Sequence, residues 1–226
     1  MKIKKILIIL FFCNILVEAQ EIKYGLKAGM CFSGFSLSNN ILNNPDFNAK
    51  GSFTLTYNVN AIIRLKSDNW WEVRFEPGYI KKGGVLEISY RFDNLNQPRD
   101  FYYTSEYSNI ELPILLNINL KKNLYLTTGI GTEYTFSTKH IKEAISKKTG
   151  LNILPTINNK INFSAILGCE YYISDYYSVA LRYSLGLTKL VATDLIANTN
   201  FPFEYTPKLT SIYINSLQLS LIYNLE

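Results

Sequence analysis

The single histidine, His140, is the side chain most often used as a base near neutral pH, and Ser137 and Glu143 lie close to it in sequence. A serine, a histidine and a carboxylate are the groups of a nucleophilic hydrolase, which would cleave a lipid or a peptide. The alternative is a solvated loop beginning at His140, in which Ile141–Lys148 forms one or two helical turns with Glu143 and Lys147 four positions apart. We expect the loop, and we predict no catalytic residue.

The sequence lacks the residues that a metal or cofactor site needs. Beyond the N-terminal leader, the only cysteines are Cys31 and Cys169, and the alternation of side chains places them on opposite faces of the predicted strands. One histidine and two separated thiols cannot build a metal site, and the two thiols cannot form a disulfide. No glycine-rich phosphate loop precedes a helix. We therefore expect no metal and no cofactor.

Basic residues gather near His140 at Lys139, Lys142, Lys147 and Lys148. They either hold lipid phosphates or form a solvated rim, and we favour the rim. The formal net charge of +5 is small for a chain of 226 residues, and part of it lies in the leader. We expect no nucleic-acid partner.

The first 19 residues read as a secretory signal peptide. Lys2, Lys4 and Lys5 precede the apolar run Ile6–Phe12, and small residues end the segment at Val17 and Ala19. The apolar run is too short for a membrane-spanning helix, which needs about 20 residues. The predicted domains are the signal peptide, residues 1–19, and one domain over residues 20–226.

Aromatic and β-branched residues recur in that domain in runs of alternating polarity, which predict strands. In the seventh run, for example, Leu181, Tyr183 and Leu185 alternate with Arg182 and Ser184. The fold class is therefore all-β. The eight predicted strands are Ile22–Ser33, Phe53–Lys66, Trp70–Phe92, Phe101–Leu120, Leu124–Lys139, Ile161–Ile173, Tyr176–Leu190 and Thr210–Leu225.

Connections between these strands alternate between short and long. The short ones are residues 67–69, 121–123 and 174–175, and the long ones are residues 34–52, 93–100, 140–160 and 191–209. Transmembrane β-barrels of the bacterial outer membrane have short periplasmic turns and long outer loops. The pattern therefore predicts an up-and-down barrel of eight antiparallel strands in a bacterial outer membrane, with lipid as its first partner.

The volume of the lumen decides which face looks outward. An eight-stranded barrel leaves only enough room for side chains to fill it, and the large apolar face would overfill that space. The polar face carries the small residues, which fit: Gly25, Gly29, Gly78, Gly129, Gly131, Gly168, Gly186, Ser164 and Ser184. We therefore expect the apolar face to contact lipid. The alternative is a soluble barrel with an aromatic core.

Aromatic residues flank the connections, as a membrane interface favours. The short turns carry Trp70, Trp71, Tyr171, Tyr172, Tyr176 and Tyr177, which predict a periplasmic girdle. An outer loop is flanked by Tyr90, Phe92, Phe101, Tyr102 and Tyr103.

The polar face also carries charges of nearly balanced sign. Charges in a narrow lumen must pair, so we predict an ion-paired plug, with an ion-conducting or proton-relaying lumen as the alternative. The members of this candidate lumen network are Lys27, Arg64, Glu72, Arg74, Glu76, Glu111, Glu133, Glu170 and Arg182.

The order of several short motifs resembles the PorT-like family of small outer-membrane β-barrels. These motifs are Tyr24–Met30, Phe75–Gly84, Ile110–Leu116, Gly129–Gly131, Gly168–Tyr171, Leu181–Leu187 and Leu221–Tyr223. The resemblance implies an eight-stranded barrel and, for some members, a link to a protein-secretion machine.

Two function hypotheses stay open beside the hydrolase. The first is a non-enzymatic interaction or assembly component of the cell envelope, with envelope or secretion-machinery proteins as partners. The second is transport or binding of a small solute or lipid through the barrel.

Overall fold

The computed structural model describes residues 21–37, 47–66, 70–91, 98–142, 159–189, 191–194 and 208–225, and the predicted signal peptide lies outside them. These residues form ten β-strands. The strands are β1 (Glu21–Leu37), β2 (Phe47–Lys66), β3 (Trp71–Phe75), β4 (Gly78–Arg91), β5 (Pro98–Lys121), β6 (Leu124–Lys142), β7 (Ile161–Tyr172), β8 (Tyr177–Gly186), β9 (Val191–Asp194) and β10 (Lys208–Leu225).

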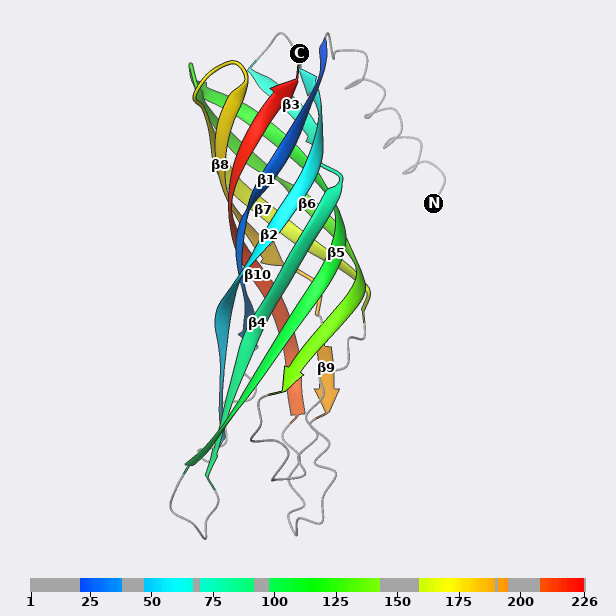
Figure 1. Cartoon of the computed structure of the whole chain (residues 1–226), viewed down its shortest axis with the longest axis vertical. Helices are drawn as coiled ribbons and strands as arrows, with labels where there is room; N and C mark the ends of the chain where they lie inside the picture. The colour runs from blue at the N-terminus through cyan, green and yellow to red at the C-terminus, as the bar shows by residue number, and fades with distance from the viewer. Residues whose placement is uncertain are drawn as a thin grey trace, which may run out of the picture.

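The strands close into one antiparallel ring (Figure 1). Strands that follow one another in the chain pair, apart from β3 with β4 and β8 with β9, and β8 pairs with β10. The ring closes where β1 pairs with β10, from Tyr24↔Leu225 to Leu37↔Ile212. β3 and β4 lie between β2 and β5 as two parts of one strand, and β9 pairs with β10 beyond the end of β8. The ring therefore has eight strand positions, which confirms the predicted eight-stranded antiparallel barrel.

The predicted third strand is interrupted at Glu76 and Pro77. Proline has no N–H to give to a ladder. The carbonyl of Pro77 still accepts a bond from the amide of Ala61 at 2.9 Å, and the amide of Glu76 donates to the carbonyl of Pro113 at 3.1 Å. The two halves therefore stay in the wall, with the Glu76 side chain inside.

The strands run further into the long connections than the sequence indicated. β4 and β5 form a long hairpin, which β2 accompanies as far as Phe47↔Tyr90 and which extends past the other strands at the end opposite the short turns (Figure 1). β6 continues to Lys142, and His140 is paired in register with Ser105. The prediction that His140 begins a loop was therefore wrong: its backbone belongs to the wall. Glu143, Lys147 and Lys148 lie outside the described residues.

The apolar side chains face outward, as predicted from volume. Leu181, Tyr183 and Leu185 are exposed, whereas Arg182 and Ser184 between them are buried. The same alternation gives β1 the outward residues Leu26, Met30 and Phe32, and β10 the outward residues Leu217, Leu219 and Leu221. A surface of this extent needs an apolar solvent.

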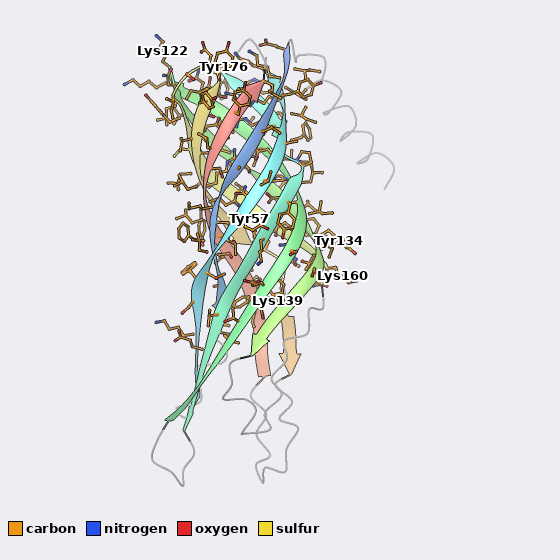
Figure 2. All side chains as sticks on the ribbon, viewed as in Figure 1. Tyr57, Lys122, Tyr134, Lys139, Lys160 and Tyr176 are labelled. Carbon is orange, nitrogen blue, oxygen red and sulfur yellow. The ribbon has the colours of Figure 1, made fainter. Side chains whose placement is uncertain are left out.

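Aromatic residues lie at two levels on the outer face. At the end with the short turns, Trp70, Tyr171 and Tyr176 are exposed, and the ring centroids of Tyr177 and Tyr223 are 5.3 Å apart. Further along the barrel, Tyr79 contacts Tyr57 at 5.7 Å and Phe136 at 6.2 Å. Figure 2 shows Tyr57 and Tyr134 far from Tyr176 along the axis.

One predicted girdle residue belongs to the interior. The hydroxyl of Tyr172 accepts hydrogen bonds from Arg64 and Arg74, each at 3.0 Å, so its ring faces the lumen. In a strand, adjacent residues point to opposite faces, and Tyr171 takes the outward position. Of the predicted outer aromatic residues, Phe92 lies outside the described residues, as do the side chains of Tyr90, Phe101, Tyr102 and Tyr103.

Candidate functional site

The structure brings the nine charged residues predicted for the lumen inside the barrel, and all nine are buried. It adds a tenth, Lys82, which is 1% exposed. The sequence signal for Lys82 was available: Gly78 was assigned to the inner face, and Lys82 lies at the same parity four residues later. With Lys82 included, the buried residues comprise five bases and five acids, so their formal charges cancel.

Arg74 on β3 is the centre of the network. Its Nε donates a hydrogen bond to Glu72 Oε1 at 2.6 Å, and its two terminal nitrogens donate hydrogen bonds to the carboxylate of Glu170 on β7. Nη2 also donates to the hydroxyl of Tyr172 at 3.0 Å. Two uncharged residues of the barrel wall donate further hydrogen bonds, Asn117 to Glu72 at 2.8 Å and Ser178 to Glu170 at 2.6 Å.

Glu76 is a second centre, placed next to the first. Lys27 Nζ lies 2.7 Å from Glu76 Oε2, and the guanidinium of Arg182 binds both oxygens at 2.6 and 2.9 Å. Arg182 Nη2 also lies 3.7 Å from Glu170 Oε2, which joins the two centres. Gly168 leaves space for this arrangement, because a Cβ there would lie 2.8 Å from Arg182 Cγ. We call these residues, with Arg64, the ionic cluster: Lys27, Arg64, Glu72, Arg74, Glu76, Glu170 and Arg182.

The remaining buried charges lie further from the short turns. Lys82 on β4 and Glu133 on β6 form an isolated pair at 2.6 Å. Glu111 accepts a hydrogen bond from Asn60 at 2.8 Å and forms no ion pair with a described residue.

A group of apolar side chains lies in the lumen toward the long loops. Leu86, Tyr107, Ile212 and Ile214 are buried there, and the rings of Phe35 and Tyr107 meet edge to face with centroids 6.2 Å apart. We call these five residues the apolar plug. Polar side chains such as Ser33, Ser105 and Asn109 are buried among them. The sequence prediction of a polar lumen was therefore incomplete, since the inner face toward the long loops is mixed.

The ionic cluster closes the lumen. Arg74, Glu76 and Glu170 are each 0% exposed. A water-filled channel passing these residues would leave their side chains accessible to solvent. The arrangement can therefore hold the walls together, but it offers no open path at this level.

Of the proposed hydrolase residues, Ser137 is the one whose side chain is described. The alternation of its strand in the sequence predicts that Ser137 lies on the polar face, yet it is exposed and lies beyond a register shift between Ser108 and Asn109 of β5. The shift adds a residue to β6, and the added residue reverses the inward and outward positions that follow. Among the proposed basic residues, Lys139 is exposed.

The two cysteines lie on opposite faces, as predicted: Cys31 is buried and Cys169 is exposed, and both are free thiols. Within the described ranges, no group of His, Cys, Asp or Glu side chains has the arrangement of a metal site. No helix among the same residues has the length and apolar character needed to cross a bilayer.

A closed antiparallel ring with an apolar outer face, aromatic residues at both levels and an ion-paired interior defines a transmembrane β-barrel. The sequence agrees with this class, because a profile described as outer membrane protein beta-barrel domain matches residues 18–192. The chain belongs to this family. It is therefore a protein of the bacterial outer membrane.

Several solved barrels have a similar fold. Ail of Yersinia pestis is 10% identical, with a TM-score of 0.42 over 91% of this chain and 100% of that one. The neisserial surface protein NspA is 7% identical, with a TM-score of 0.49 over 91% and 100%. OprG of Pseudomonas aeruginosa is 9% identical, with a TM-score of 0.42 over 91% and 94%. No curated protein matches the chain in sequence.

Proposed function

We propose that this protein is a non-enzymatic component of the outer membrane that acts by contact with other envelope proteins, in interaction or assembly. The observation that carries the proposal is the closed lumen. Seven charged side chains, six from five strands and Glu76 from the break between β3 and β4, meet in the ionic cluster, and its central residues are inaccessible to solvent. A barrel that is filled in this way serves best as a rigid support for its loops and turns.

The hairpin of β4 and β5 is the surface best suited to such contacts. Its strands pair from Gly78↔Glu111 to Arg91↔Pro98 and extend beyond the other strands (Figure 1). The motifs that resemble the PorT-like family support a secretion machine as the partner. A mature protein that begins after Ala19 is part of the proposal, and mass spectrometry of the N-terminus checks it.

The alternative is transport of a small solute or lipid through the barrel. It would require the ionic cluster to open, which breaks several buried ion pairs at once. Single-channel recording separates the two functions. We expect no sustained open steps from the purified protein, and large steady currents would contradict the closed lumen.

Crosslinking in intact cells, followed by purification from membranes, tests the partner directly. We expect discrete protein adducts when a photoreactive residue replaces Arg91 or Pro98 in the hairpin. The matched control replaces Leu219, which faces lipid, and should give lipid adducts only. Equal protein adducts at both positions, or adducts at neither, would contradict the assignment of the hairpin as the contact surface.

A further inference from the structure

A cavity of about 460 Å³ opens at the end of the barrel that carries the short turns. By the topology of outer-membrane barrels, this end faces the periplasm. The volume falls within the range of small-molecule sites, which is roughly 300–1,000 Å³. Its charged lining residues are the bases Lys23, Arg64, Lys66 and Lys122 and the acids Glu72 and Asp175.

The positive charges of this cavity are less compensated than the negative ones. Glu72 is already bonded by Arg74 at 2.6 Å and by Asn117 at 2.8 Å. Lys23 is paired with Glu21 at 3.2 Å. Three lining charges form no ion pair with a described residue, namely the acid Asp175 and the exposed bases Lys66 and Lys122. Figure 2 shows Lys122 extending outward at this end of the barrel. The cavity therefore favours an anion.

Arg64 supplies a specific feature at the inner wall of the cavity. It is 3% exposed, and its Nη1 donates to the hydroxyl of Tyr172 at 3.0 Å. Its Nη2 lies 3.8 Å from Glu170 Oε1, and neither Nε nor Nη2 donates a hydrogen bond to a described residue. Both nitrogens are buried, so Arg64 contributes positive charge to the inner wall of the cavity and not a free pair of donors.

Aromatic rings complete the lining. Tyr125 and Tyr172 both line the cavity, and their ring centroids are 5.0 Å apart. Such rings provide an apolar wall for the organic part of a ligand, while the cations bind its charged end. A site of this kind suits a small molecule that ends in an oxyanion.

We propose that this cavity is a periplasm-facing binding site for a small organic solute, held through a carboxylate or phosphate group. Lys66 and Lys122 bind the oxyanion, and Arg64 adds attraction from the inner wall. The site goes beyond the role proposed above, because a barrel that acts only through protein contacts needs no ligand. It also leaves the lumen closed, since the rest of the ionic cluster lies behind Arg64 and Glu72.

Calorimetric titration of the full chain in uncharged detergent at low salt tests the site. The probes are N-acetyl-dialanine, its neutral amide and inorganic phosphate. We expect at least one oxyanion to bind with a Kd below about 10 mM and the amide not to bind. Tighter binding of N-acetyl-dialanine than of phosphate identifies a carboxylate ligand, and the reverse order identifies a phosphate.

Variants then locate the site. The double variant Lys66→Gln with Lys122→Gln alters only exposed side chains and leaves the ionic cluster intact. It should lower the affinity about tenfold. Lys139→Gln, at the far end of the barrel, is the matched control and should bind as the unchanged protein does (Figure 2). Absence of binding by either oxyanion, or equal losses in the control, would overturn the proposal.

Discussion

The two halves of the lumen differ in the kinds of side chain that fill them. The half near the short turns is filled by the ionic cluster, in which Arg74 and Glu76 each have several partners. The half near the long loops contains the apolar plug, with Leu86 and Tyr107 among its members, together with uncharged polar side chains and one isolated ion pair, Lys82 with Glu133.

The difference shows what each kind of filling requires. Apolar side chains need only fit in volume, because no partner has to be present. Charged side chains need every partner in place, because a buried charge without compensation costs several kcal/mol. The ionic half should therefore be sensitive to single substitutions that change charge, and the apolar half to substitutions that change volume.

Arg74→Met should have the largest effect. It leaves Glu72 and Glu170 without their shared cation, and the expected loss in free energy of unfolding is roughly 3–5 kcal/mol. Urea unfolding in lipid vesicles measures it. The double variant Arg74→Met with Glu170→Gln removes one of the stranded charges, so it should lose less than the single variant. A loss below about 1 kcal/mol for Arg74→Met would show that the ionic cluster tolerates an absent partner.

Leu86→Ala tests the apolar plug. The cavity that it leaves should cost about 2–4 kcal/mol in the same unfolding measurement. The control is Leu219→Ala, at a residue 47% exposed on the outer face, where lipid fills the space and the loss should be smaller. Equal losses in free energy of unfolding for the two variants would contradict the inner position of Leu86.

The isolated pair gives the smallest expected effect. Lys82→Met combined with Glu133→Leu replaces both charges by apolar groups of similar size, so stability should stay within about 1 kcal/mol of the unchanged protein. Lys82→Met alone should cost about 3 kcal/mol, because Glu133 then stays buried without its cation. A double variant as unstable as the single one would mean that the pair contributes more than charge compensation.

The sequence predicted the ring and the faces of the strands because both depend on a strict period of two. Arg182 between Leu181 and Tyr183 is the plainest example, and nine of the ten buried charges were found in this way. Lys82 and Tyr172 have the parity of Gly78 and Glu170, which were assigned to the inner face, so the period places both inside. They were missed or misplaced because each is adjacent to a residue of the same type, Lys81 and Tyr171, and the two were not separated by face.

Two further properties depend on geometry that the sequence does not contain. Irregularities such as the register shift near Ser108 reverse the faces after them, which is why Ser137 was misplaced. The choice of ion-pair partners depends on the tilt and stagger of the strands. Arg182 binds Glu76 although 106 positions separate them, and no local pattern indicates that pairing.

The pairing of β1 with β10 also governs how the barrel is made. The strand that completes the wall, β10, is made after the other strands of the ring, so those strands stay unclosed until β10 has crossed the inner membrane. During that interval β1 keeps an unsatisfied edge, which is a template for joining other chains. A helper that shields this edge, or a membrane insertion step that supplies a temporary neighbour, is thus a physical need of the fold.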